Sequence, residues 1–307
     1  MFNAHLTRTS ILGTFLGLIP AFSLAASGIC DKTTRELLKA CQLEASDAAH
    51  VAFVVCLNTK NADDSAACLK QARTDVRDAL MQCGEGRDVR GEVCDAIGQG
   101  AYDPPIRPGN FVSRIDNPFS PFKPGAWWEY LGRTADGIER DRVEVLDEQR
   151  TIQGVNVTAV RDRVWLDDEL TEDTVDWFAQ DVRGNVWYFG ELSQAFEDGL
   201  LSSLEGSFEA GKDGAKAGIL MKAAPRVGET YRQEWSPGSA EDMAQVQSLN
   251  APDDVPFKGS AKVLMTREFS ALSPGDEELK FYVPGIGLTL EIDLETGERL
   301  ELVDYSH

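Results

Sequence analysis

The sequence is poor in histidine. It contains three histidines among 307 residues, His5, His50 and His307, and the first lies in a segment that we expect to be removed on export. A Ser-His-Asp or Cys-His catalytic arrangement would have to use one of the other two. The chain also has no HExxH, G-x-S-x-G, P-loop or dinucleotide-binding motif. These absences disfavour histidine-dependent hydrolases, zinc sites built from His and Cys, and nucleotide-dependent enzymes.

Positive charge is also scarce. The chain has 30 Lys and Arg against 51 Asp and Glu, which gives a formal net charge of −21 at pH 7. A surface that binds nucleic acid or an anionic membrane needs a basic face, so this balance excludes both classes of partner. Solubility is the simplest role for the acidity, and cationic partners or bound metal ions are the alternatives.

Long hydrophobic runs are missing near the N-terminus. The run from Ile11 to Phe22 is too short to span a membrane. It follows one basic residue, Arg8, and precedes small residues that end at Ala25, which is the layout of a secretory signal peptide. We therefore predict a signal peptide over residues 1–25 and a periplasmic or secreted protein without a membrane span.

Cysteine is absent from most of the chain, because all six lie between residues 30 and 94. An even number of cysteines in an exported protein predicts disulfides. When the cysteines are paired from the outermost inward, the two residue numbers of every pair have the same sum, which is what an antiparallel hairpin folded near residue 62 produces. From the fifteen possible pairings we predict three nested disulfides, Cys30 with Cys94, Cys41 with Cys83, and Cys56 with Cys68.

The cysteine spacing favours helices in this hairpin. Cys30 to Cys41 corresponds to about three helical turns and Cys41 to Cys56 to about four, so the cysteines share one broad helix face. The arrangement is geometrically similar to helical hairpins with twin C-x9-C pairs, although the spacing here is C-x10-C. No Cys-x-x-Cys motif occurs, which argues against a redox role. We predict a disulfide-stapled helical hairpin over residues 26–98.

Local signals suggest where these helices begin and break. Thr33, three residues before a glutamate, is a candidate capping box for the first helix. Asp63 and Asp64, with the serine that follows them, are candidate caps for the second helix. Gly84 and Gly86 predict an interruption of the second helix.

The rest of the chain changes from a linker to a strand-like pattern. Residues 99–125 are rich in Pro and Gly and have no apolar period, so we predict a linker that partly packs on its neighbours. From residue 126 to 305 short strand-like segments follow one another; Leu288, Leu290 and Ile292, for example, alternate with polar residues. About ten strands with short loops predict an antiparallel β-domain, a curved sheet or an open barrel, in an α+β fold.

Two segments of the predicted β-domain resemble sequences of other proteins. "YVPGIGLTLEID" is similar to the Tyr-x-Pro-Gly-x-Gly-Leu strand found near the end of many exported bacterial β-proteins and lipoproteins. "WFAQDVRGNVWYFGE" resembles a segment of a group of uncharacterised secreted bacterial proteins. The resemblance extends over residues 117 to 303. It implies a curved antiparallel β-domain and supplies no activity.

Aromatic residues are concentrated in the predicted strands. Neighbours such as Trp127 and Trp128 must point to opposite faces of a sheet. One of each pair is therefore exposed unless the hairpin, a Gly-rich crossing or a ligand covers it. Packing in the core or between domains is the simpler explanation for these aromatic residues. The more specific hypothesis is that they line a concave surface that binds a ligand. The candidate ligand-binding residues are Trp128, Trp165, Trp177, Trp187, Tyr188 and Trp235.

Carboxylates crowd one segment, residues 167–176. Asp167, Asp168 and Asp173 are candidate calcium ligands, because carboxylate oxygens suit Ca²⁺. The segment lacks the spacing and the glycine of a calcium loop, however, and a solvated turn is the simpler interpretation. Paired acids could also catalyse glycoside hydrolysis, but the 51 acidic residues single out no pair. No other cofactor is predicted.

These features predict an exported, non-catalytic binding or envelope-associated protein. It would hold a small apolar ligand or a protein partner on an aromatic face of the sheet. One alternative is a carboxylate-dependent enzyme that acts on glycans, and another is a structural protein that docks through the hairpin. A close acid pair in a pocket would favour the enzyme, a dry apolar cavity the binding protein, and an exposed apolar hairpin face the docking role.

Overall fold

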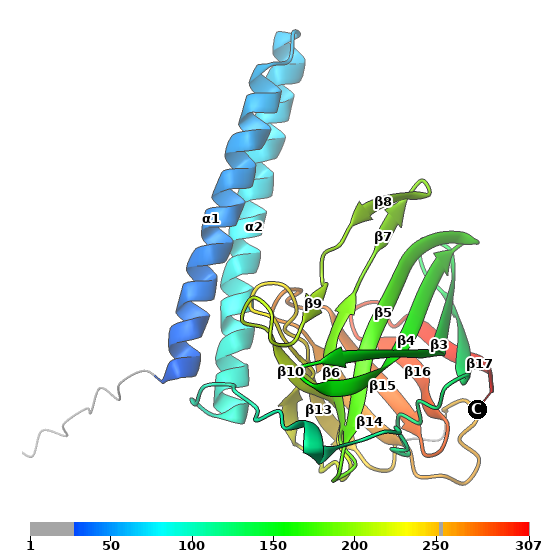
Figure 1. Ribbon diagram of the computed structural model, residues 1–307. Coiled ribbons are helices and arrows are strands. Elements are labelled where there is room, and N and C mark those ends of the chain that lie inside the picture. The colour runs from blue at the N-terminus through cyan, green and yellow to red at the C-terminus, as the bar shows by residue number, and fades with distance from the viewer. Residues whose placement is uncertain (1–27, 252–253, 307) are drawn as a thin grey trace, which may run out of the picture.

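The chain forms a long helical hairpin followed by a large antiparallel sheet. A computed structural model describes residues 28–251 and 254–306 (Figure 1). The sheet curves until it is nearly closed and barrel-like. The predicted α+β fold, a stapled helical hairpin followed by a curved antiparallel sheet or open barrel, is therefore confirmed. The predicted signal peptide lies outside the described residues.

The hairpin consists of α1 (Ile29–Leu57) and α2 (Ala62–Ile97), which lie side by side and stand out from the β-domain (Figure 1). Three disulfides join Cys30 to Cys94, Cys41 to Cys83, and Cys56 to Cys68, with Cα atoms 5.4 to 5.8 Å apart. The predicted nested pairing is confirmed. Each disulfide can stabilise the hairpin by about 2–4 kcal/mol, largely by restricting the unfolded chain.

The ends of the two helices differ from the prediction. α1 begins at Ile29, so Thr33 lies inside the first turns, where its hydroxyl donates to the carbonyl oxygen of Cys30 at 2.8 Å. α2 is capped by Asn61, whose side-chain oxygen accepts from the backbone N–H groups of Asp63 and Asp64. The cap therefore precedes the acidic residues that we expected to provide it, and these acids instead favour the first turn through the helix dipole.

The predicted break in α2 is wrong. The helix continues through Gly84 and Gly86 to Ile97. A Cβ at Gly86 would lie 2.5 Å from the carbonyl oxygen of Ala271, whereas a Cβ at Gly84 would meet nothing within 4 Å. Gly86 therefore allows α2 to approach the backbone of the β-domain closely, and it does so without ending the helix.

The helix α1 is long and apolar enough to cross a membrane by length and composition. It is tied to α2 at three points, and α2 carries charged side chains such as Lys70, Arg77 and Glu85. A span by α1 would take those charges into hydrocarbon, at a high cost in free energy. Apolar side chains of α1 are instead between 59% and 71% exposed at Leu43, Val51, Val54, Val55 and Leu57. They form the surface that the docking hypothesis requires.

The main strands of the sheet follow one another by short loops. They are β2 (Trp127–Arg133), β3 (Ile138–Ile152), β4 (Val155–Leu166), β5 (Glu169–Asp181), β6 (Val186–Leu192), β10 (Lys216–Met221), β11 (Thr230–Arg232), β12 (Glu234–Trp235), β13 (Met243–Ser248), β14 (Leu264–Phe269), β15 (Glu277–Val283), β16 (Gly287–Asp293) and β17 (Arg299–Ser306). The short strands are β1 (Phe111–Val112), β7 (Ala195–Glu197), β8 (Leu200–Ser203) and β9 (Phe208–Glu209).

Antiparallel pairing between neighbouring strands produces the barrel-like shape of the sheet. Consecutive strands pair from β2 to β6 and from β13 to β17. β17 pairs with β2, and β6 pairs with β10. β10 also pairs with β12, and β11, which directly precedes β12 in the chain, pairs with β13. Strands β10 to β12 thus connect the series β2–β6 to the series β13–β17. One face of the sheet is thus turned toward an interior.

The two faces of the sheet have separate apolar cores. The interior core includes Trp128, Tyr130, Val160 and Phe178. On the opposite face, strands β3 to β6 carry a second core, which the segment before β2 covers through η1 (Pro108–Asn110) and β1. The ring of Phe111 in this segment packs 5.5 Å from that of Phe189. The residues that we expected to form a linker therefore cover the outer face of the sheet.

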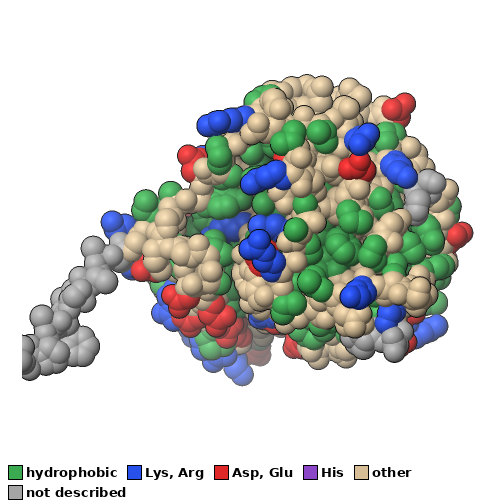
Figure 2. Space-filling view, turned by 90° about the horizontal axis from the view of Figure 1, so that it is seen from below, with side chains coloured by type: hydrophobic (Ala, Val, Ile, Leu, Met, Phe, Trp, Pro, Cys, Tyr) green, Lys and Arg blue, Asp and Glu red, His purple; other side chains and the backbone are tan. Residues whose placement is uncertain are grey.

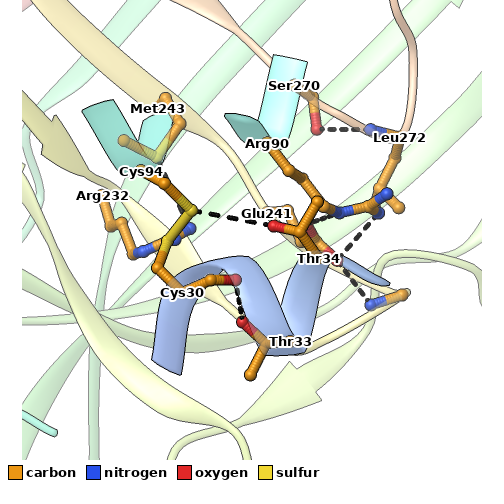
Figure 3. Close-up of polar contacts among 11 residues, drawn as sticks. Cys30, Thr33, Thr34, Arg90, Cys94, Arg232, Glu241, Met243, Ser270 and Leu272 are labelled. Atoms are coloured by element: carbon orange, nitrogen blue, oxygen red, sulfur yellow. Dashed lines mark hydrogen bonds and ion pairs between the residues drawn. A yellow bond between two sulfur atoms is a disulfide. The ribbon is translucent and has the colours of Figure 1, made fainter. Parts of the chain in front are cut away.

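A buried ion pair joins the base of the hairpin to the β-domain (Figure 3). Arg90 of α2 donates from Nε and Nη2 to the carboxylate of Glu241, at 2.6 and 3.1 Å. The same carboxylate accepts from the backbone N–H of Gly238 at 2.8 Å. Because the rest of the hairpin extends away from the β-domain (Figure 1), these contacts and the close approach at Gly86 set where the hairpin stands.

Candidate functional site

The interior of the β-domain contains a cavity of about 180 Å³. Part of its wall is aromatic, and consists of Phe122 from the segment before β2 with Trp128 and Phe178 from the strands. The ring of Phe122 lies 5.9 Å from that of Trp128 and 5.2 Å from that of Phe178. A cavity of about 150 Å³ is large enough to hold benzene, so the volume of this space admits a group of about that size.

The remainder of the cavity wall is unusually rich in ionisable groups. Carboxyl groups are almost never fully buried unless they are paired. The side chains that line this part of the cavity are Asp141, Asp162, Asp176, Glu268, Glu291 and Lys280. Five acidic side chains and one basic side chain thus line this part of the cavity wall. It therefore offers more hydrogen-bond acceptors than donors when the acids are ionised.

Asp141 and Asp162 come from the neighbouring strands β3 and β4. One carboxylate oxygen of each, Oδ1, is buried without a hydrogen-bond partner among the described residues. Burial raises the pKa of Asp141 well above its usual range, and the nearby charge of Asp162 raises it further. Asp141 therefore favours its protonated form, or a hydrogen-bond donor from a bound molecule, over an ionised carboxylate beside Asp162.

A second group of acids surrounds Tyr188. Its hydroxyl is in hydrogen-bond contact with Asp176 and, at 3.0 Å, with Glu191. Burial raises the pKa of Asp176 well above its usual range and that of Glu191 to about 7. Protonation of these acids near neutral pH reduces the repulsion that two adjacent carboxylates would otherwise create.

Lys280 is held by several carboxylates. Its Nζ lies 3.6, 3.2 and 3.5 Å from oxygens of Glu268, Glu278 and Glu291. Burial lowers the pKa of Lys280, but the charges of these glutamates outweigh burial and raise it well above its usual range. Burial raises the pKa of Glu291 to about 7. Lys280, the one cation among the described residues that line the cavity, is therefore already surrounded by acids. In the described part of the chain no Lys or Arg forms an ion pair with Asp141 or Asp162.

The six candidate aromatic residues do not form one surface. Trp128 lines the interior cavity, and Tyr188 stacks on Phe178 in the interior core. Trp177 and Trp187 lie in the outer core, beneath the segment before β2. Alternation along the strands explains this separation, since Trp187 and Tyr188 are adjacent and must point to opposite faces.

The other two candidates lie elsewhere. The guanidinium of Arg140 stacks on Trp165, with its carbon 3.8 Å from the ring centre. Trp235 lies at the junction between the hairpin and the β-domain, where the guanidinium of Arg232 is 4.1 Å from its ring centre and Tyr102 makes an edge contact. Of the six, only Trp128 lines the interior cavity.

The structure does not assemble the candidate calcium ligands. Asp167 and Asp168 occupy the turn between β4 and β5 with positive φ, and Asp167 accepts from the backbone N–H of Ile138 at 2.9 Å. Asp173 forms an ion pair with Arg161 at 2.5 Å. Within residues 28–251 and 254–306 no group of three His, Cys, Asp or Glu side chains is arranged to hold a metal ion. These acids act locally, in a turn and in an ion pair.

The interior acids were not singled out from the sequence, although a signal for them exists. In β3, Asp141 is in phase with Val143 and Val145, and in β4, Asp162 is in phase with Val160. A carboxylate that takes the place of an apolar residue in an alternating strand points to the buried face.

Comparison with known proteins supplies no relative from which a function could be transferred. No protein-family model, no curated protein and no solved structure matches the chain. The function must therefore be argued from the cavity itself.

Proposed function

We propose that this is an exported binding protein whose β-domain holds a small molecule in the interior cavity, without a covalent step. The molecule has an apolar body and a hydrogen-bond-donating end, such as an amine. The observation that carries this proposal is the two-part wall of the cavity, with aromatic rings on one side and buried carboxyl groups on the other. An export route is supported by the three disulfides, which form in oxidising compartments.

The aromatic part of the wall supports the apolar body. Phe122, Trp128 and Phe178 surround a space in which a ring or a short chain would lose its contact with water. The indole N–H of Trp128 donates to the carbonyl oxygen of Ile286 at 2.7 Å. The ring is thereby fixed in place, and a ligand meets a wall that is already formed.

The carboxyl groups support the donating end. Asp141 and Asp162 each have a buried oxygen without a hydrogen-bond partner among the described residues. A protonated amine would satisfy these oxygens and would stabilise the ionised form of Asp141. A carboxylate ligand would add a further negative charge to a wall that has five acids and one base.

Native mass spectrometry of the disulfide-bonded protein from its own exported fraction tests the proposal. We expect a retained mass of small-molecule size that is released at higher collision energy. As a defined probe, benzylamine should raise the melting temperature, whereas benzoate, with the same ring and the opposite charge, should not. No retained mass together with equal responses to the two probes would contradict the proposal. The pair of Asp141 and Asp162 in the cavity is the feature that would favour the alternative, a glycan-acting enzyme, and turnover of an oligosaccharide by the protein would support that alternative instead.

A matched pair of variants locates the binding. Val143 lines the cavity, and Val143→Phe should fill it and abolish the response to benzylamine. Val303 is 44% exposed on β17, so Val303→Phe makes the same change away from the cavity and should leave the response unaltered. Equal responses of the two variants would place the binding outside the cavity.

A further inference from the structure

A second hollow lies where the base of the hairpin meets the β-domain. It has a volume of about 400 Å³, within the range of about 300–1,000 Å³ that is usual for small-molecule sites. Its wall includes Ile97, Tyr102, Lys222, Tyr231, Arg232 and Trp235, and we call it the junction groove. The wall combines the end of α2, the segment that follows it, and strands β10 to β12, so the groove exists only when the hairpin is docked.

The charge of the junction groove is opposite to that of the whole protein. The chain has 51 acidic residues and a net charge of −21. Nevertheless, the described residues that line the groove include Lys222 and Arg232 and no Asp or Glu. Figure 2 shows Lys and Arg side chains among hydrophobic side chains on the underside of the molecule. The groove therefore favours an anion with an apolar body.

Arg232 is a buried cation without a carboxylate in direct contact. Burial lowers its pKa, and the charge of Glu241, the partner of Arg90, partly offsets that effect. It is 8% exposed, and no Asp or Glu in the described part of the chain lies within ion-pair distance of it. The other buried arginine, Arg90, has Glu241 as its bidentate partner. In Figure 3, Arg232 lies beside the Cys30–Cys94 disulfide and Met243, whose sulfur is 3.7 Å from Nη1. The contrast between the two arginines marks Arg232 as the one that has an unfilled position for an anion.

One buried donor of the groove also lacks a partner. Nε of Arg232 is buried and makes no hydrogen bond among the described residues. The neighbouring Tyr231 points to the opposite face of β11, into the interior core, so its hydroxyl is not part of the groove. A buried hydrogen-bond donor without an acceptor costs free energy. An anionic oxygen of a ligand would be a strong acceptor for it, because hydrogen bonds to charged groups are stronger than those between neutral groups. This observation is independent of the charge count and points to the same class of ligand.

We propose that the junction groove binds a small organic carboxylate, with the carboxylate near Arg232 and Lys222 and the apolar body against Trp235 and Tyr102. Lys222 already pairs with Glu229 at 3.1 Å, so Arg232 provides the cation that has no carboxylate in direct contact. A single negative charge suits this one cation, which favours a carboxylate over a phosphate. The ligand of this groove is thus distinct in charge from the ligand of the interior cavity.

Calorimetric titration of the full disulfide-bonded protein with 2-naphthoate tests this inference. The neutral analogue 2-naphthylmethanol, which has the same rings, is the ligand control. We expect one naphthoate per chain and an affinity for the alcohol that is lower by about tenfold or more. Equal affinities for the acid and the alcohol would overturn the inference, because the cations would then contribute nothing.

Variants assign the binding to the groove. Lys222→Gln and Arg232→Lys should each lower the affinity for naphthoate by about tenfold. Lys212 is 62% exposed and lies outside the groove, so Lys212→Gln should leave the affinity within about twofold. If Arg232→Lys does not fold, Lys222→Gln alone decides. An unchanged affinity in Lys222→Gln would overturn the inference.

The interior cavity and the groove can be told apart. Val143→Phe should abolish the response to benzylamine and leave naphthoate binding intact. If Val143→Phe removes naphthoate binding and Lys222→Gln does not, the probe enters the interior cavity, and the inference about the groove fails while the proposed function stands.

Discussion

Arg90 and Glu241, which are 151 residues apart in the chain, form a bidentate ion pair at the base of the hairpin. Their side chains are only 11% and 1% exposed. Taking two charges out of water is costly, and it is repaid only when the geometry and the remaining hydrogen bonds are good. Here the carboxylate also accepts from Gly238. The pair therefore fixes the orientation of the hairpin, whereas its net contribution to stability is small.

Removing one partner of this pair should be strongly destabilising. Arg90→Ala leaves the carboxylate of Glu241 buried and without its cation, which should lower the free energy of unfolding by about 3–5 kcal/mol. Arg87→Ala is the matched control on the same helix, because Arg87 pairs with Asp88 at the surface, and it should cost less than about 1 kcal/mol. Urea denaturation measures both. Similar values for the two variants would show that Glu241 is not left uncompensated.

Two glycines of α2 should respond to alanine with opposite signs. Gly84→Ala adds a methyl group to open space, and the higher helix propensity of alanine should stabilise the protein by about 0.5–1 kcal/mol. Gly86→Ala places a methyl group 2.5 Å from the carbonyl oxygen of Ala271, and displacement of that backbone should cost about 1–3 kcal/mol. Chemical denaturation of the two variants is the measurement. The same sign for both would contradict the close approach of α2 to the β-domain.

The disulfides at the two ends of the hairpin should differ in their effect on the groove. Cys30 lines the junction groove, so replacing Cys30 and Cys94 by alanine should weaken naphthoate binding as the base of the hairpin loosens. The Cys56 and Cys68 pair lies at the opposite end of the hairpin, next to the turn between α1 and α2, and the corresponding double variant should bind normally while becoming more sensitive to protease in that turn. Calorimetry and limited proteolysis check the two expectations. A normal affinity in the Cys30 and Cys94 double variant would count against the groove.

Stability should fall as the pH rises through the range in which the buried acids ionise. Burial raises the pKa of Glu191 from 4.5 to about 7. Between these values the folded protein retains a proton that the unfolded chain has lost, so the free energy of unfolding decreases as the pH rises through this window. At 1.36 kcal/mol per pKa unit, Glu191 alone should account for a decrease of about 3 kcal/mol between pH 4.5 and pH 7.

The variant Glu191→Gln isolates this effect. It removes one titrating group from the interior, so its stability should depend less on pH than that of the wild-type protein between pH 5 and pH 8. Glu205, on an exposed loop, provides the control: Glu205→Gln should keep the wild-type dependence. Denaturation curves at several pH values are the measurement. Parallel pH dependences in all three proteins would show that Glu191 is not protonated by burial.

Regular spacing made the hairpin and the strands predictable. The cysteine positions indicated the pairing, because in an antiparallel hairpin two paired residues lie at equal sequence distances from the turn. The bond between Cys41 and Cys83 is an example. The alternation at Leu288 and Leu290 indicated a strand, now part of β16. The local breaks were less predictable: Gly86 was taken as a helix interruption, whereas it permits contact with Ala271, a residue that is distant in the sequence.

The sequence by itself determined the class of fold, the three disulfides and the scarcity of catalytic histidines, because these follow from residue types and from their local spacing. Only the tertiary structure decided which side chains share a site. It separated Trp187 from Tyr188, brought Asp141 and Asp162 into one cavity, and placed Arg232 in a groove without acids. The closure of a curved sheet and the docking of a helix depend on strand pairing and packing between distant segments, which no local pattern specifies.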